Sequence, residues 1–375
     1  MYYLTFIFTS IIALVSGETI EGSYIIKLRG ETRISIDTHL DLVRSMFNNR
    51  VAGNEIKTVY RNLDSIYHAK LTSDVLEKVQ ALTEVEYIEK DSVVTINTIQ
   101  TDSPWGLARI SQKTKLAGSS YNYTYAADGT GVFVYVVDTG IMVDHPGFEG
   151  RASFGAKFAG SNNKDENGHG THCAGTIGSK SYGVAKNATL VAVRVLDGSG
   201  SGTNSGVLSG INWVAGDKKG PKGNVISMSL GGGKSKAVND AVEAAIKKGI
   251  VVVVAGGNDN DDACDYSPAS APNAITVAAS DINDKRATFS NYGKCIDVFA
   301  PGVNIKSTWN DGATKSISGT SMATPHVAGL AAYFLSQESA TPSELGAKIV
   351  SLSSKDAIAN AGSWSPNLFV YNNVA

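Results

Sequence analysis

Three short motifs in this sequence supply a carboxylate, an imidazole and a hydroxyl. Asp138 ends the apolar run in VVDTG, His169 lies between glycines in NGHGTHCAG, and Ser321 precedes an apolar helical run in SGTSMATPH. A serine hydroxyl is a weak nucleophile until a base takes its proton, and a histidine oriented by a carboxylate is such a base. The motifs therefore predict nucleophilic catalysis by Ser321, with His169 as the base and Asp138 as its orienting partner.

A fourth residue fits the charge that such an attack creates. Asn258 follows the apolar run VVVVAGG, and its amide and the backbone N–H of Ser321 could both donate hydrogen bonds to an oxyanion. Each residue alone also has a structural interpretation, such as a helix cap or a packed histidine. Their joint occurrence with flanking glycines favours a catalytic site over a binding protein without catalytic activity.

The elements that must position these residues alternate in type from residue 98 onward. Apolar strand candidates occupy residues 131–137, 188–196, 225–230 and 250–254, and helical patterns occupy residues 237–248 and 324–335. Such alternation predicts an α/β fold, with a parallel sheet covered by helices on both faces. Functional sites in these sheets gather at the carboxyl ends of the strands.

The N-terminal part of the chain has a different character. Residues 1–17 carry no charge, and their apolar run ends in small residues, which indicates a secretory signal peptide. A membrane anchor is the alternative, but the run is shorter than the ~20 residues of a span. Residues 18–97 hold 13 acidic and 10 basic residues and read as a small α+β unit, with strands at 23–28 and 85–89 and helices at 38–47 and 73–82. Ser73 is the expected N-cap of the second helix.

Composition and two rejected motifs exclude other functions. The 375 residues carry a net charge of −2, so we expect no nucleic-acid partner. We also expect that the protein is a monomer and that it does not associate with a membrane after the signal peptide is removed. The run GGGKS at residues 231–235 imitates a phosphate-binding loop, but Met228 stands where that motif needs glycine. The sequence around Ser321 also lacks the G-x-S-x-G pattern of α/β-hydrolases. His169, His172 and Cys173 lie too close together, without a distant fourth ligand, to favour zinc.

Together the three motifs resemble the subtilisin-like serine proteases, most closely the proteinase K branch. The likeness extends to SPWGLARI at residues 103–110, to SPAS at 267–270, to FSNYG at 289–293 and to YNN at 371–373. It implies a three-layer, parallel-sheet subtilisin-like catalytic domain at residues 98–375. It also implies a serine-type endopeptidase without a catalytic cofactor, with Asp138, His169 and Ser321 as the triad and Asn258 in the oxyanion hole. Gly256 departs from the alanine that relatives usually carry, which could shift substrate preference.

Substrate binding and processing follow from the same resemblance. The family sandwiches an extended peptide between two segments, which here are Gly200, Ser201 and Gly202 on one side and Ser229, Leu230, Gly231 and Gly232 on the other. We expect broad specificity, with aromatic or aliphatic residues preferred before the cut bond; plain glycine-rich loops are the alternative. Residues 18–97 resemble the inhibitory propeptide, which is a chaperone and intramolecular inhibitor. The expected zymogen cleaves itself between Asn97 and Thr98 and is secreted to the extracellular space, with vacuolar residence as the alternative.

The resemblance also assigns the cysteines and a cation. It implies a disulfide between Cys264 and Cys295 and a buried free thiol, Cys173, beside the catalytic histidine. It implies structural Ca²⁺ bound by the Asp297 carboxylate and the carbonyls of Pro272 and Ala274, oxygen ligands that suit this ion. Independently, Asn122 and Asn187 begin glycosylation sequons.

Overall fold

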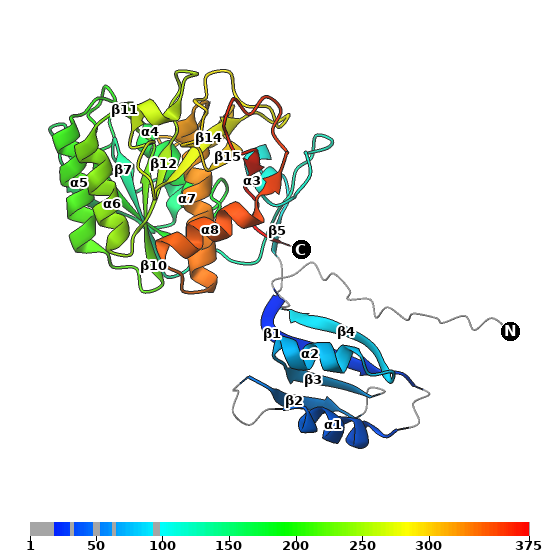
Figure 1. Cartoon of the computed structure of the whole chain (residues 1–375). Helices are drawn as coiled ribbons and strands as arrows, with labels where there is room; N and C mark the ends of the chain where they lie inside the picture. Colours follow the sequence, from blue (N-terminus) through cyan, green and yellow to red (C-terminus); the bar gives the residue numbers. More distant parts are fainter. Residues whose placement is uncertain (1–18, 31–33, 48–52, 62–64, 93–97, 375) are drawn as a thin grey trace. The chain divides into compact units, whose positions relative to one another are not determined.

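The structure is a computed structural model of the whole chain, and it describes residues 19–30, 34–47, 53–61, 65–92 and 98–374 (Figure 1). The chain divides into two compact units, residues 1–96 and 97–374. The predicted signal peptide, residues 1–17, and the predicted processing residue Asn97 lie outside the described residues. None of the helices in the described ranges is long and apolar enough to cross a bilayer.

The first unit is a four-stranded antiparallel sheet with two helices. Its strands lie in the order β2 (Glu55–Tyr60), β3 (Ile66–Lys70), β1 (Thr19–Leu28) and β4 (Val85–Ser92), and its helices are α1 (Ile36–Ser45) and α2 (Ser73–Gln80). Apolar residues of both helices and of β1, β3 and β4 share one core, which includes Ile26, Leu40, Tyr67 and Val79. The expected α+β unit is therefore present. Thr72, and not Ser73, occupies the N-cap of α2, because Ser73 already has helical geometry.

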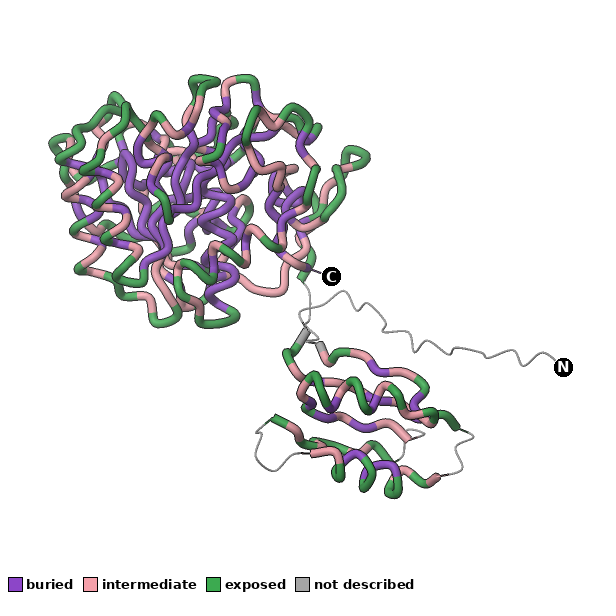
Figure 2. Tube along the Cα trace, in the orientation of Figure 1, coloured by how far each residue is buried: buried purple, intermediate pink, exposed green. Residues whose placement is uncertain are grey.

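The second unit is built on a large sheet whose strands are almost all parallel. Its nine strands in the described part of the chain lie side by side in the order β18 (Ser354–Lys355), β19 (Leu368–Phe369), β15 (Val298–Pro301), β14 (Ile275–Ser280), β12 (Val251–Ala255), β10 (Gly223–Met228), β7 (Val132–Asp138), β9 (Thr189–Arg194) and β8 (Ala152–Lys157). Only the pairing of β18 with β19 is antiparallel. Figure 2 shows that buried residues concentrate along these central strands.

Helices cover both faces of this sheet. The helices of the unit are α3 (Trp105–Ile110), α4 (His169–Gly178), α5 (Asn204–Asp217), α6 (Lys236–Lys247), α7 (Thr320–Gln337) and α8 (Pro342–Leu352). Along β7, Val134 and Val136 join the core that contains α4, α7 and α8, whereas Tyr135 and Val137 join the core that contains α5 and α6. Alternate side chains of a strand point to opposite faces, so the predicted three-layer arrangement is confirmed.

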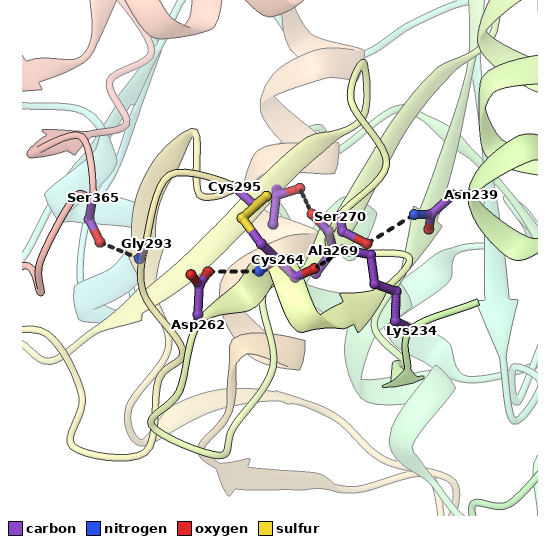
Figure 3. The surroundings of a disulfide bond; sticks show 10 residues. Lys234, Asn239, Asp262, Cys264, Ala269, Ser270, Gly293, Cys295 and Ser365 are labelled. Carbon is purple, nitrogen blue, oxygen red and sulfur yellow. Dashed lines mark hydrogen bonds between the residues drawn. A yellow bond between two sulfur atoms is a disulfide. The ribbon is translucent and has the colours of Figure 1, made fainter. Parts of the chain in front are cut away.

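Shorter elements complete the second unit. Two single 3₁₀ turns are η1 (Pro146–Phe148) and η2 (Ala263–Asp265). Three two-stranded ribbons pair β5 (Thr98–Gln100) with β6 (Tyr123–Tyr125), β11 (Gly232–Gly233) with β13 (Tyr266–Ser267), and β16 (Ile305–Thr308) with β17 (Thr314–Ile317). The predicted disulfide is present: Cys264 in η2 is bonded to Cys295, 31 positions along the chain (Figure 3). Cys173 is a buried free thiol.

Candidate active site

Asp138 and His169 meet at the carboxyl edge of the large sheet. Asp138 is the last residue of β7 and is fully buried, and His169 is the first residue of α4, with 23% of its side chain exposed. Asp138 Oδ1 lies 2.8 Å from His169 Nδ1 and accepts a hydrogen bond from the backbone N–H of Thr139 at 2.7 Å. The Nδ1–H must therefore point to the carboxylate, which leaves Nε2 as the free acceptor when the ring is neutral.

The two glycines that flank His169 make this approach possible. Gly168 has φ +102, and a Cβ on it would lie 2.4 Å from the ring of Trp309. A Cβ on Gly170 would lie 2.1 Å from the carbonyl oxygen of Gly140, in the turn that follows Asp138. A larger residue at position 170 would push α4 away from the end of β7, and one at position 168 would collide with Trp309 and strain the backbone just before His169.

The environment of the imidazole favours its protonated form. Burial alone lowers the pKa of His169, but the negative charge and the hydrogen bond of Asp138 outweigh it, so the pKa lies well above its ordinary value. The Sγ atom of Cys173 is 3.9 Å from His169 Nδ1. Burial raises the pKa of this thiol, so Cys173 is a neutral neighbour of the ring.

Ser321 lies in the first turn of α7, and its hydroxyl is bonded to Ser229. Its Oγ donates to the backbone carbonyl of Ser229 at 3.1 Å, while the Oγ of Ser229 donates to the backbone carbonyl of Ser321 at 2.9 Å. Cys173 also donates to the Ser321 carbonyl, with Sγ 3.3 Å from the oxygen. Cys173 thus contacts both His169 and Ser321. Among the described residues, no hydrogen bond joins His169 Nε2 to Ser321 Oγ.

The carbonyl of Ser321 is free for these contacts because of Pro325. A residue at this position of α7 would normally donate its backbone N–H to the carbonyl four residues earlier, and proline has no N–H. The hydroxyl of Ser229 and the thiol of Cys173 take the place of the missing donor. Ser229 and Ser321 are therefore held together by two reciprocal hydrogen bonds.

Asn258 follows β12 and caps the start of α7. Its Oδ1 accepts from the backbone N–H of Thr320 at 2.8 Å and from the Thr320 hydroxyl at 3.0 Å. Because a backbone N–H can only donate, the oxygen of the amide must face Thr320 and the Nδ2 group must point the other way. The amide is exposed and borders the same cavity as Ser321. It can therefore donate to an oxygen placed beside Ser321.

Two cavities are lined in part by residues of the segment 229–232. The first, of about 330 Å³, is bordered by Leu230, Ala255, Ala269, Asn258 and Ser321 among others. The second, of about 470 Å³, borders His169. All seven residues predicted to bind substrate line the second cavity: Gly200, Ser201, Gly202, Ser229, Leu230, Gly231 and Gly232. The structure thus brings both predicted segments to the same place as His169.

Gly256 is one of the residues that line the cavity of about 330 Å³. A Cβ on it would lie 2.7 Å from Cδ1 of Ile296 and 3.1 Å from the carbonyl oxygen of Val277. The Ile296 side chain could rotate away, whereas the carbonyl belongs to the neighbouring strand β14. Alanine at this position would therefore press the segment before Asn258 toward the cavity.

The three residues predicted to bind calcium line one small cavity. Pro272, Ala274 and Asp297 border a space of about 170 Å³. Asp297 Oδ2 accepts from the backbone N–H of Thr276 at 2.8 Å, and burial raises the pKa of this carboxyl to about 6. In the described residues no basic side chain pairs with it. A half-buried carboxylate without a counter-charge, beside backbone carbonyls, fits the oxygen donor set of a hard cation.

His172 does not join a metal site with its neighbours. Its Nε2 lies 2.9 Å from the Ile305 carbonyl and 3.1 Å from that of Lys315, on β16 and β17. Burial lowers its pKa to about 4. His172 is therefore not available as a second histidine ligand for zinc, a site that the spacing already disfavoured. Candidate ligand atoms of Asp138, His169 and Cys173 do lie within 4.8 Å of one another, but Asp138 and His169 are hydrogen-bonded to each other.

One buried acid near the site was not predicted. Asp165 is 6% exposed and accepts hydrogen bonds from the residues on both sides of the Asp138–His169 pair. A sequence signal existed, because the polar run DENG at residues 165–168, just before α4, is typical of a turn in which an aspartate side chain accepts from the following backbone N–H groups.

Comparisons with known proteins identify the family of this chain. Residues 129–363 match the family described as "Subtilase family", and residues 23–97 match "Peptidase inhibitor I9". The chain is 45% identical to "Proteinase R" of Parengyodontium album, over 95% of this chain and 90% of the relative. It is 46% identical to "Cuticle-degrading protease" of Metarhizium anisopliae, over 94% and 90%. A solved structure, "Crystal structure of a cold adapted subtilisin-like serine proteinase", superposes with a TM-score of 0.70 at 47% identity, and covers 73% of this chain and 99% of its own. The chain therefore belongs to the subtilase family of serine endopeptidases and carries an inhibitor-type propeptide before its protease domain.

Proposed function

We propose that this protein is a secreted endopeptidase of broad specificity, made as a zymogen that processes itself. The observation that carries the proposal is the 2.8 Å contact between buried Asp138 and His169, with Cys173 in contact with both His169 and Ser321 at the start of α7. The other proposed parts are the oxyanion donors, the peptide-binding segment, the processing site and a calcium ion.

The proposed reaction begins when His169 takes the proton of Ser321. For this the Ser321 hydroxyl leaves the carbonyl of Ser229 and turns to Nε2 of His169, the ring atom that Asp138 leaves free. The Ser321 oxygen attacks the peptide carbonyl, and Asp138 stabilises the imidazolium that forms. His169 then protonates the leaving amine, and a water molecule activated by His169 hydrolyses the acyl-enzyme.

The negative charge on the attacked oxygen needs fixed donors. Asn258 offers its Nδ2 group, because Thr320 holds its Oδ1 on the other side. The backbone N–H of Ser321, in the first turn of α7, is the second donor. Neither donor has to reorganise, which makes such stabilisation effective.

The segment 229–232 is the proposed backbone partner of an extended substrate, with the segment 200–202 on its other side. The cavity next to Ser321 and Asn258 is lined by the apolar side chains of Leu230, Ala255 and Ala269 together with glycines and polar residues. It suits an aromatic or aliphatic side chain before the cut bond. Backbone pairing along the rest of the peptide is indifferent to sequence, so we expect broad specificity.

The proposed domain boundaries are residues 1–17 for the signal peptide, 18–97 for the propeptide and 98–375 for the mature enzyme. In support, Thr98 already pairs with Tyr125 in the ribbon of β5 and β6, within the second unit. Secretion and extracellular residence rest on the uncharged apolar N-terminus. N-terminal sequencing of the secreted enzyme checks the cleavage between Asn97 and Thr98, and a start outside residues 96–100 would contradict it.

Ca²⁺ is the proposed structural ion, held by Asp297 and the carbonyls of Pro272 and Ala274. The supporting observation is the half-buried carboxylate that faces these residues without a basic partner in the described chain. The ion would neutralise this charge and fix the start of β14. No step of the reaction depends on it.

Labelling of the nucleophile tests the proposal directly. The processed protein is treated with a fluorophosphonate probe, and the labelled peptide is identified by mass spectrometry. We expect one label, on Ser321, and none in the Ser321→Ala variant. Absence of label on correctly folded, processed protein would refute the proposed catalytic role of Ser321.

A further inference from the structure

Asp165 is a buried acid whose carboxylate is fully occupied by neighbouring donors. Its Oδ1 accepts from the Thr139 hydroxyl at 2.8 Å and from the backbone N–H groups of Asn167 and Gly168 at 3.1 and 2.8 Å. Its Oδ2 accepts from the backbone N–H and the hydroxyl of Thr171 at 3.0 and 2.6 Å. Five hydrogen bonds to one carboxylate, 6% exposed, make a rigid junction.

The donors to the Asp165 carboxylate belong to residues adjacent in sequence to Asp138 and to His169, the proposed acid–base pair. Thr139 directly follows Asp138, Asn167 and Gly168 directly precede His169, and Thr171 lies in the first turn of α4. The Thr139 oxygen also accepts from the backbone N–H of Gly170 at 2.9 Å. Asp165 and Thr139 together therefore tie the end of β7 to the start of α4.

The Asp138–His169 contact has little support of its own. Both of the hydrogen bonds to the Asp138 side chain go to Oδ1, and Oδ2 is buried without a hydrogen-bond partner in the described residues. One hydrogen bond fixes a distance but not the relative orientation of two elements. That orientation must come from the backbone on both sides, which the Asp165 carboxylate holds.

We propose that Asp165 is a positioning residue of the catalytic site, acting through Asp138 and His169 without touching substrate. This inference rests on the proposed function. It implies that loss of the junction slows the chemical step, because His169 then spends less time aligned with Ser321. It also implies that substrate binding is unaffected, since Asp165 is not among the residues that line either cavity beside the segment 229–232.

Asp165→Asn is the primary test, measured on the processed protein obtained by expressing the whole chain. An amide keeps the shape of the side chain but replaces one accepting oxygen with a donating NH₂ group. This NH₂ group would face the N–H or O–H donors of Thr139, Gly168 or Thr171, and two donors cannot form a hydrogen bond with each other. We expect kcat to fall by about 10- to 100-fold and KM to change less than about twofold. The rate of Ser321 labelling should fall in parallel with kcat.

Asp128→Asn is the matched control. Asp128 also organises a turn, since it accepts from the N–H and hydroxyl of Thr130 and from Nδ2 of Asn187, but it lines neither cavity beside the segment 229–232. We expect wild-type kcat and KM for this variant. A fall in kcat equal to that of Asp165→Asn would mean that any loss of a turn-forming carboxylate suffices, and would overturn the proposal.

Thr139→Val decides the case in which Asp165→Asn does not fold or process. Valine keeps the volume of threonine and removes the oxygen that joins Asp165 to the N–H of Gly170. Thr139 lines the cavity beside His169, so only kcat is compared for this variant. A lower kcat supports the proposal, and wild-type kcat in either variant overturns it. If the wild-type protein itself takes no label on Ser321, the proposed function has failed, which is a different result.

Discussion

Removal of the Cys264–Cys295 disulfide should destabilise the protease domain without changing its fold. The segments that it joins have other contacts: Cys264 N donates to Asp262, Lys234 Nζ donates to the Cys264 carbonyl, and Gly293 N donates to the hydroxyl of Ser365 (Figure 3). In addition, the backbone N–H of Ala263 donates to the Tyr292 carbonyl at 2.8 Å. The native arrangement should therefore persist in the Cys264→Ala, Cys295→Ala double variant.

The magnitude follows from the length of the closed loop. With a sequence separation of 31, the chain-entropy relation gives about 3.7 kcal/mol at 25 °C, because the cross-link restricts the unfolded chain. For a unit of roughly 280 residues, an unfolding entropy of about 2.1 cal/mol/K per residue converts this loss into a fall in Tm of roughly 6 °C. Nearly all of the lost stability should come from the greater conformational entropy of the unfolded chain, since the folded state keeps its other contacts.

The assay compares guanidinium unfolding of full-length proteins in a Ser321→Ala background, where autolysis does not contribute. We expect the double variant to lose about 3–4 kcal/mol of unfolding free energy. Dithiothreitol should lower the stability of the parent to the same level and leave the double variant unchanged. A loss below about 1 kcal/mol, with the disulfide shown to be formed in the parent, would refute the loop-entropy reasoning.

Three further outcomes are expected. Asn258→Ala should lower kcat by about 10²–10³ with little change in KM, measured on a peptide amide, because it removes one oxyanion donor; a change confined to KM would contradict this role. The rate constant kcat/KM should rise with pH through a midpoint above about 6.5, because His169 acts only when neutral and Asp138 raises its pKa; Asp138→Asn should move the midpoint to lower pH and slow the reaction. Chelation of calcium should lower the Tm of the Ser321→Ala protein, and Asp297→Asn should abolish that response; equal responses in both proteins would place the ion elsewhere.

Much of the fold was predictable because the elements are long and regular. The apolar runs that became β7 and β12 are bounded by glycine, and their strand character follows from length and β-branched content. Less predictable were element ends: α7 begins at Thr320, four residues before the periodic apolar pattern that indicated residues 324–335. Helix starts depend on capping contacts, here from Asn258 in a distant part of the chain, and sequence-local reasoning cannot supply such a partner.

The composition of the site was predictable, but its internal geometry was not. The motifs named Asp138, His169, Ser321 and Asn258, and the structure places them on β7, α4, α7 and the turn after β12. No pattern indicated that the Ser321 hydroxyl would be bonded to Ser229, or that one carboxylate, Asp165, would join the ends of two elements. Such contacts depend on how segments meet in three dimensions.

Pro325 illustrates how one sequence feature acquires its meaning only from that packing. A proline inside a helix ordinarily costs about 3 kcal/mol, partly because a backbone carbonyl loses its donor. In this fold the carbonyl so released belongs to Ser321, and it is satisfied by the hydroxyl of Ser229 and the thiol of Cys173. The lost helical hydrogen bond is thus exchanged for contacts that attach the residue bearing the proposed nucleophile to the proposed substrate segment and to α4. A donating residue at position 325 would compete with Ser229 for the same carbonyl, so the proline favours the contact that the site requires.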